Sequence, residues 1–323
     1  MPALCVPPDP AVAALAVHGG RIFAARAAFP DAPEPWIDLS TGINPHGYSI
    51  GSLPADAWQR LPDLEALAGL EAAARAFYRA GPQAGVVAAP GTQALIGLLP
   101  RLRPAATVAV LGFGYQEHPA AWRAAGCTVR VVEDVEALAA ADVAVVINPN
   151  NPDGRTVSPF RLATLAQRMG QRGGLLVVDE AFAEAGEASL LPHVEGPNTL
   201  VLRSFGKFFG LAGLRLGFAL GDPALCAALR AGLGPWAVSG PALTIGTRAL
   251  GDARWQADTR HRLIEAAARL DGLLEAAGLA VLGGTPLFRL ARHAEAARIF
   301  ERLGRAGILV RPFGPEPTWL RFG

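Results

Sequence analysis

The chain has 323 residues, of which 51% are hydrophobic and 18% are charged, a composition that supports a large buried core and excludes a disordered chain. Lysine and arginine together number 29 against 28 acidic residues, so there is no basic surplus for binding nucleic acid or an anionic membrane. No apolar run approaches the roughly 20 residues that span a bilayer, and the first residues lack the pattern of a signal peptide.

The three cysteines, Cys5, Cys127 and Cys226, match no disulfide or metal-site spacing, and the six histidines are dispersed. This cysteine usage fits a reducing cytoplasm, and we expect no metal site. The length allows one large and one smaller domain.

Strand-like and helical segments alternate through the middle of the chain, as in a mostly parallel sheet with crossover helices. The expected strands are Val86–Ala89, Val108–Leu111, Val129–Val132, Val143–Ile147, Leu175–Asp179, Thr199–Leu202 and Leu216–Leu220. The expected helices between them are Gln116–Ala125 and Pro159–Arg172.

After Asp222 the pattern becomes helical, and Asp252–Ala277 carries apolar residues at the spacing of one long helix. We therefore predict an α/β fold with a large, mostly parallel sheet domain at residues 40–222. A smaller α+β domain would combine residues 1–39 with residues 223–323.

The strand that begins at Val86 breaks at Pro90-Gly91, and we expect a helix to open at Thr92. A helix N-terminus entered through glycine is suited to binding an anion. A dinucleotide-binding alternative at Leu111–Tyr115 is weak, because the third glycine of that fingerprint is absent.

Two buried strands end in polar residues. The strand Val143–Ile147 runs into an Asn-Pro-Asn-Asn-Pro loop that offers neutral amide donors, and the strand Leu175–Asp179 ends in a carboxylate. Open α/β sheets place ligands at this edge, where an acid can pair with the ring nitrogen of a cofactor.

Lys207 and Arg215 stand in the largely apolar, glycine-rich run Val201–Phe218. A buried ammonium with apolar neighbours needs a partner, loses its proton or is used covalently. A lysine of lowered pKa is what imine formation with an aldehyde cofactor requires. The alternative is that both side chains reach from a loop to solvent.

Five features follow one another along the chain: the glycine-threonine turn, the asparagine loop, Asp179, Lys207 and the later arginine. In kind and in order they resemble the motifs of the fold-type I pyridoxal-phosphate enzymes, in the branch that contains histidinol-phosphate aminotransferase and threonine-phosphate decarboxylase. The resemblance spans His18 to Gly323 and implies the fold-type I transferase fold, pyridoxal 5'-phosphate as cofactor and a homodimer.

The resemblance also implies roles for individual residues. Lys207 would form the internal Schiff base, Asp179 would bind the pyridinium nitrogen, Asn151 would hydrogen-bond the phenolic oxygen, and Tyr115 would stack on the ring. The cofactor phosphate would lie at the Gly91 turn, on the backbone amides of Thr92 and Gln93, with Ser204 and Arg215 completing its site.

Three positions depart from the family pattern. Phe182 replaces a tyrosine found in many relatives, and Gly206 replaces a serine or threonine next to the lysine. Leu61 stands where histidinol-phosphate aminotransferases usually have a tyrosine that reaches the phosphate across the dimer.

The N-terminal segments His18-Gly-Gly and Ser-Thr-Gly42-Ile-Asn-Pro resemble the threonine-phosphate decarboxylase group. His18, Gly42, Asn151, Arg311 and Arg321 would then bind a small phosphorylated amino acid. We expect Arg321 to bind its carboxylate, with Arg311 and His18 near its phosphate. The reverse assignment of the two arginines stays open, and for His18 taken alone the alternative is a surface histidine.

The expected reaction is decarboxylation of L-threonine O-3-phosphate to (R)-1-aminopropan-2-ol O-2-phosphate in cobalamin biosynthesis. A histidinol-phosphate or related aminotransferase is the alternative, because the same residues serve both reactions and only the orientation of the substrate differs. A non-catalytic binding protein on this fold is a third possibility, and it predicts no covalent bond at Lys207.

Overall fold

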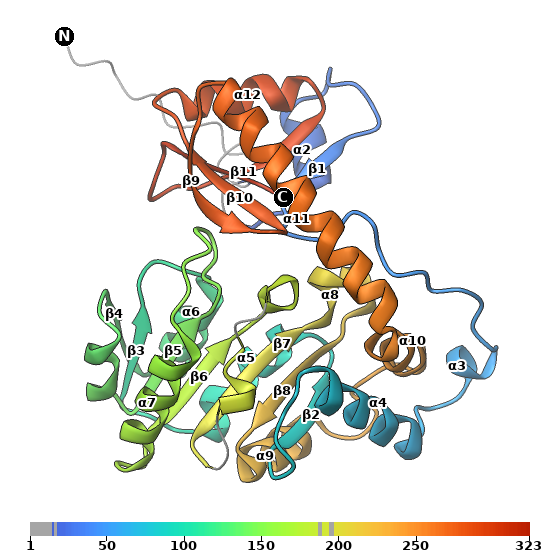
Figure 1. Cartoon of the computed structure of the whole chain (residues 1–323), viewed down its shortest axis with the longest axis vertical. Helices are drawn as coiled ribbons and strands as arrows, with labels where there is room; N and C mark the ends of the chain where they lie inside the picture. Colours follow the sequence, from blue (N-terminus) through green and yellow to red (C-terminus); the bar gives the residue numbers. More distant parts are fainter. Residues whose placement is uncertain (1–14, 16–17, 187–188, 194–196) are drawn as a thin grey trace. The chain divides into compact units, whose positions relative to one another are not determined.

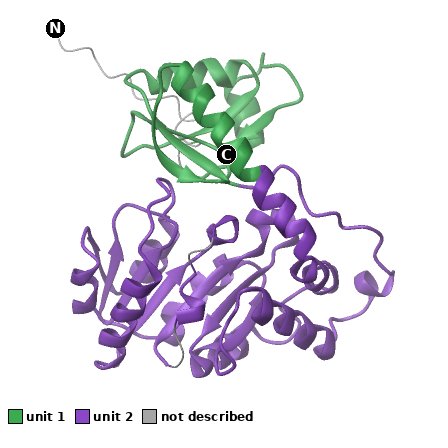
Figure 2. Ribbon diagram, in the orientation of Figure 1, with its two compact units in different colours: residues 1–42, 263–323 green, residues 43–262 purple. Residues whose placement is uncertain are grey.

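The computed structural model describes residues 15, 18–186, 189–193 and 197–323. They form two compact units, drawn in separate colours in Figure 2. Unit 2 comprises residues 43–262, and unit 1 combines the residues up to Gly42 with residues 263–323. The domain division expected from the sequence placed residues 223–262 with the C-terminal part, whereas these residues pack with unit 2.

Unit 2 is built on a seven-stranded sheet in the order β2-β8-β7-β6-β5-β3-β4 (Figure 1). Its strands are β2 (Gly85–Ala89), β3 (Thr107–Leu111), β4 (Thr128–Val132), β5 (Val143–Ile147), β6 (Leu175–Asp179), β7 (Thr199–Ser204) and β8 (Gly217–Gly221). Among these seven strands, β8 alone runs opposite in direction to the other six. The predicted mostly parallel sheet is therefore confirmed, because every expected strand is present within one or two residues.

The central strands β5 and β6 are buried at all five positions. Strands covered on both faces lack the alternation of apolar and polar residues, which explains the continuous apolar runs in the sequence. One core cluster joins residues of α5 (Thr92–Leu102), α6 (Glu117–Ala124) and α9 (Pro223–Leu233) to alternate positions of the strands.

The remaining helices of unit 2 are α3 (Asp56–Gln59), α4 (Leu64–Phe77), α7 (Pro159–Gly170), α8 (Phe205–Phe208) and α10 (Gly240–Gly251), and α11 (Ala253–Ala276) begins in this unit. Side chains cap several of them, as with Asp222, which accepts hydrogen bonds from the amides of Ala224 and Leu225 at the start of α9. The predicted helices at 116–125, 159–172 and 252–277 are confirmed.

Unit 1 is built on a five-stranded sheet in the order β1-β11-β12-β10-β9. Its strands are β1 (Ile37–Leu39), β9 (Ala280–Thr285), β10 (Phe288–Arg292), β11 (Ile308–Pro312) and β12 (Trp319–Phe322), and its helices include α2 (Ile22–Ala28) and α12 (Ala296–Arg305). An apolar cluster that includes Phe29, Phe300, Val310 and Leu320 forms its core. The sheet places Arg311 and Arg321 on adjacent strands.

Among the helices that the structure describes, none combines the length and the apolar character needed to cross a membrane. Cys127 and Cys226 are free cysteines, and Cys5 lies outside the described residues.

Candidate active site

The carboxyl ends of the parallel strands in unit 2 carry the residues expected to bind a cofactor. Gly91 follows β2, the asparagine loop follows β5, Asp179 ends β6 and Ser204 ends β7. Because these strands run in the same direction, the four segments lie at one edge of the sheet (Figure 1).

A glycine turn brings the predicted phosphate-binding residues together. Gly91 has a φ of 83°, and a Cβ atom there would lie 2.6 Å from the Arg215 guanidinium, so this position needs glycine. A Cβ atom on Gly217 would lie 2.6 Å from the Thr92 amide nitrogen, and Gly217 pairs with Ser204 in the sheet. The Thr92 amide at the start of α5, Arg215 and Ser204 therefore surround one place suited to a phosphate.

Tyr115 is held beside this edge by hydrogen bonds. Its hydroxyl donates to Oε1 of Gln93 at 3.1 Å, and the Gln93 amide donates to Glu117 at 2.9 Å. Gln93 was expected to contribute only its backbone amide, and the structure adds an orienting role for its side chain.

Asp179 is buried and is bound by His118, to which the sequence had suggested no role. Nε2 of His118 lies 2.8 Å from Oδ2 of Asp179, and both side chains are almost fully buried. The second carboxylate oxygen accepts a hydrogen bond from the Ala181 amide at 3.0 Å. The imidazole and the Ala181 amide therefore fix the orientation of the Asp179 carboxylate. No signal in the sequence points to this contact, because 61 positions separate His118 in α6 from Asp179 at the end of β6.

Two asparagine side chains of the loop after β5 form hydrogen bonds with the backbone. Asn148 donates to the Val157 carbonyl and accepts from the Val157 amide, and Asn150 donates to the Phe113 carbonyl at 3.0 Å. These two buried side chains fix the loop, and the next residue, Asn151, is half-buried at the edge of the sheet.

Lys207 lies in α8, directly after β7, and is half-buried. Its Nζ atom is 5.4 Å from the centroid of the Phe182 ring, and its carbonyl accepts a hydrogen bond from the Asn44 amide. Phe182, the position where many relatives carry tyrosine, thus provides an apolar surface beside the lysine.

The expected substrate-binding residues other than Asn151 lie in unit 1. Arg311 and Arg321 are directly paired in the antiparallel register of β11 and β12, so their side chains share one face of the sheet. Arg321 is buried and donates to the Ser40 carbonyl at 2.8 Å. Burial first, and then the positive charge of Arg311, lowers the pKa of Arg321 to about 9. Adjacent cations in such a place favour a ligand with negative charge.

The N-terminal segment of unit 1 packs closely around Ser40. The Gly20 amide donates to Oγ of Ser40 at 2.7 Å, and a Cβ atom on Gly19 would lie 2.2 Å from the Ser40 carbonyl oxygen. His18 precedes this contact and is exposed, whereas Gly42 is buried. The glycines therefore allow the segment that carries His18 to lie against the Ser-Thr-Gly loop.

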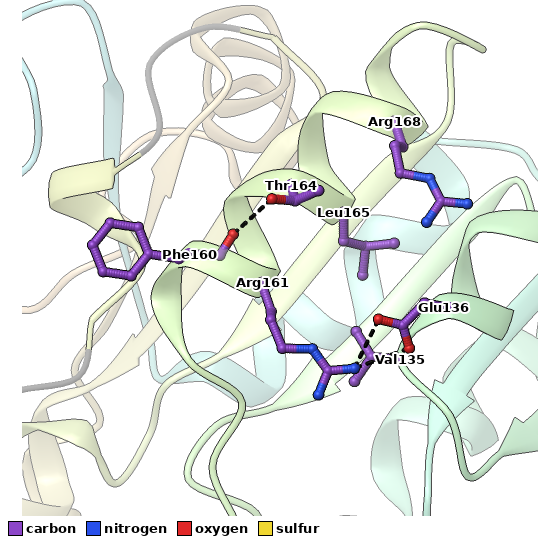
Figure 3. A pocket seen from close by; sticks show the side chains of 7 residues that line it. All are labelled: Val135, Glu136, Phe160, Arg161, Thr164, Leu165 and Arg168. Carbon is purple, nitrogen blue, oxygen red and sulfur yellow. Dashed lines mark hydrogen bonds and ion pairs between the residues drawn. The ribbon is translucent and has the colours of Figure 1, made fainter.

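A cavity of about 200 Å³ on the surface of α7 contains none of the predicted site residues. Figure 3 shows the exposed ion pair between Arg161 and Glu136 at its edge. Exposed pairs of this kind contribute little. The described residues also hold no cluster of three histidine, cysteine, aspartate or glutamate side chains that could bind a metal.

The residues present fit pyridoxal phosphate. The Gly91 turn leaves space that a side chain would fill and is flanked by Arg215, the buried Asp179 offers a fixed carboxylate, and Lys207 lies at the same edge of the sheet. These are the three groups needed for the phosphate, the ring nitrogen and the aldehyde.

Comparisons with known proteins agree with this chemistry. The family model for aminotransferase class I and II matches residues 34–323. The chain is similar to two threonine-phosphate decarboxylases. One, from a Sinorhizobium species, is 47% identical over 316 residues, which cover 95% of this chain and 92% of that protein. The other, from Pseudomonas aeruginosa, is 44% identical over 310 residues, with the same coverage of 95% and 92%.

The structure is also similar to that of a histidinol-phosphate aminotransferase from Sinorhizobium meliloti in complex with pyridoxal-5'-phosphate. The TM-score is 0.80 at 23% identity, and the match covers 99% of this chain and 94% of that one. This likeness confirms the predicted fold-type I transferase fold. The chain therefore belongs to the aminotransferase class I and II family, and pyridoxal phosphate is its cofactor.

Proposed function

We propose that the chain decarboxylates L-threonine O-3-phosphate to (R)-1-aminopropan-2-ol O-2-phosphate in cobalamin biosynthesis. The observation that carries this proposal is the identity of 47% and 44% to two threonine-phosphate decarboxylases over 95% of the chain. The paired arginines of β11 and β12 support it, because this substrate carries both a carboxylate and a phosphate.

The cofactor residues of unit 2 have distinct tasks in this proposal. When bound, pyridoxal phosphate supplies an aldehyde for the substrate amine and a ring that accepts the electron pair released at Cα. Asp179, oriented by His118, would hold the proton on the ring nitrogen. Tyr115 would stack on the ring, and Asn151 would hydrogen-bond its phenolic oxygen. Lys207 would anchor the cofactor and would carry the proton that is delivered to Cα.

The direction of the reaction depends on which bond at Cα stands perpendicular to the ring. We propose that Arg321 binds the substrate carboxylate and that Arg311 and His18 bind its phosphate, with Gly42 lending a backbone amide. Two anchored anionic groups leave the amino acid little freedom to rotate. This binding would present the bond between Cα and the carboxylate for cleavage.

A histidinol-phosphate aminotransferase is the second candidate, favoured by the structural likeness to such an enzyme. Its cofactor residues would be the same, but its reaction requires a 2-oxo acid. Leu61 weighs against it, because the side chain there has no hydroxyl to donate to a phosphate.

We further propose a cytoplasmic homodimer. Four apolar side chains of unit 2, Trp58, Leu61, Leu64 and Trp236, are each more than half exposed, and the last two line a cavity of about 350 Å³ with Pro62 and Val238. Large apolar side chains gathered in this way are typical of a protein interface. Sedimentation analysis tests the oligomeric state, and a monomer at micromolar concentration would contradict the proposed dimer.

Turnover assays separate the two candidate reactions. The purified protein, loaded with pyridoxal phosphate, is supplied with L-threonine O-3-phosphate alone or with histidinol phosphate and 2-oxoglutarate. We expect sustained carbon dioxide release in the first mixture. Activity confined to the second mixture would establish the aminotransferase instead.

A further inference from the structure

Two cofactor contacts flank a buried ion pair that the proposed mechanism does not use. Glu180 follows Asp179 at the end of β6, and Arg203 precedes Ser204 at the end of β7. Nη1 of Arg203 lies 2.5 Å from Oε2 of Glu180, and both side chains are almost fully buried. The pair therefore joins the ends of β6 and β7, which are parallel neighbours in the sheet; Figure 1 shows the two strands side by side.

The sheet register places this pair behind the cofactor residues. Asp179 pairs with Leu202, and the Glu180 amide donates to the Leu202 carbonyl at 2.9 Å. Because successive side chains of a strand point to opposite faces, Asp179 and Ser204 share one face. Glu180 follows Asp179 and Arg203 follows Leu202, so these two side chains lie on the opposite face, where they form the ion pair.

Several other contacts hold the pair rigid. The Glu180 carboxylate also accepts hydrogen bonds from the Ser189 hydroxyl and the Leu190 amide, each at 2.7 Å. The Arg203 guanidinium lies 4.4 Å from the centroid of the Tyr78 ring, and its Nε is 3.4 Å from the Glu184 carboxylate. An ion pair with this many contacts has little freedom to rearrange.

We propose that Glu180 and Arg203 form a clamp across β6 and β7 that sets the spacing between the ring-nitrogen contact at Asp179 and the phosphate contact at Ser204. Both act as positioning residues, because they reach the cofactor only through their chain neighbours. The proposal rests on the cofactor roles proposed above for Asp179 and Ser204.

The clamp makes a specific prediction, because spacing matters only to a ligand that binds at both ends. Pyridoxal has the ring nitrogen and the aldehyde but lacks the phosphate. Loss of the correct spacing should therefore weaken the binding of pyridoxal phosphate far more than that of pyridoxal. General loosening of the site would weaken the binding of both ligands by similar factors.

The test measures dissociation constants of both ligands for the full-length protein freed of cofactor, by equilibrium dialysis and visible absorption. The quantity compared is the ratio of the pyridoxal constant to the pyridoxal phosphate constant. In Glu180→Gln and in Arg203→Lys we expect this ratio to fall about fivefold or more. A smaller change overturns the proposal, and Arg203→Lys decides the matter if Glu180→Gln does not fold.

Two further variants distinguish the clamp from a general loss of stability and from the phosphate contact itself. Leu229→Ala opens a cavity in the buried face of α9 and should lower the melting temperature while leaving the ratio unchanged. An equal fall of the ratio in this variant would overturn the clamp. Ser204→Ala should lower the ratio by itself. If it does so while the clamp variants do not, the clamp fails but the proposed cofactor site stands.

Discussion

Replacing Arg321 with methionine should stabilise unit 1 while removing substrate binding. The side chain is almost fully buried, and its pKa is lowered to about 9 by burial and by Arg311. At about 1.4 kcal/mol per pKa unit, holding this arginine charged near neutral pH costs the folded protein about 5 kcal/mol. The cost is fully present below pH 9 and is relieved only as the pH rises above it, so it applies throughout the physiological range.

Part of this gain is offset in the variant, since the hydrogen bond from Arg321 to the Ser40 carbonyl is lost at a cost of about 1–3 kcal/mol. The difference between the gain of about 5 kcal/mol and this loss is a net stabilisation of about 2–4 kcal/mol, which we expect for Arg321→Met. In the wild-type protein, the bound anionic substrate would offset the cost of keeping Arg321 charged.

Hydrogen exchange of the amides in β10 and β12 measures this effect within unit 1. We expect slower exchange in Arg321→Met than in the wild type, and protection by L-threonine O-3-phosphate in the wild type only. The matched control is Arg289→Met on β10, whose partly exposed ion pair with Asp271 has no proposed substrate role. Faster exchange in Arg321→Met, or undiminished protection by the substrate, would refute the reasoning.

Three further predictions concern unit 2. Lys207→Ala should abolish the visible absorption of the covalently bound cofactor and lower kcat by at least about 10²-fold, and a normal spectrum would refute its role. His118→Leu leaves the buried Asp179 carboxylate without its imidazole partner, so cofactor binding should weaken by about 1.5–3 kcal/mol, or roughly 10–150-fold. Equilibrium dialysis should show that His118→Gln binds the cofactor more tightly than His118→Leu does. Burial raises the pKa of Glu184 to about 7, so the stability that its protonated form contributes is present below pH 4.5 and is lost as the pH rises to about 7. Relative to Glu184→Gln, the free energy of unfolding of the wild type in urea should fall by about 3 kcal/mol across this pH window. Parallel pH profiles of the two proteins would contradict the assignment.

The sequence predicted the sheet of unit 2 well, because most of its strands are apolar runs that end near glycine, proline or a charged residue; β4, with Arg130 in its middle, is the exception. The runs at Val143–Ile147 and Leu175–Asp179 match β5 and β6 residue for residue. The unit boundary was harder to place. Residues 223–262 are helical like the C-terminal part, and only their packing against unit 2 assigns them there.

The candidate site was predictable where chemistry is local in sequence and not where it depends on contacts between strands. Lys207 and the Gly91 turn are visible as motifs. The bond between His118 and Asp179 joins residues 61 positions apart, and the pair of Glu180 and Arg203 joins residues 23 positions apart. No spacing rule reveals such contacts. The first depends on how α6 packs against the sheet, and the second on the parallel register of β6 and β7 and the alternation of side chains along each strand.

The most direct test of the proposed function follows the fate of the substrate carboxylate and of Cα in one NMR experiment. L-Threonine O-3-phosphate labelled with ¹³C in its carboxyl group is incubated with the enzyme in D₂O, without any 2-oxo acid. We expect all of the label to leave as carbon dioxide or bicarbonate, and the 1-aminopropan-2-ol phosphate formed to carry one deuteron at the carbon that was Cα. A product that keeps the labelled carboxylate would contradict decarboxylation.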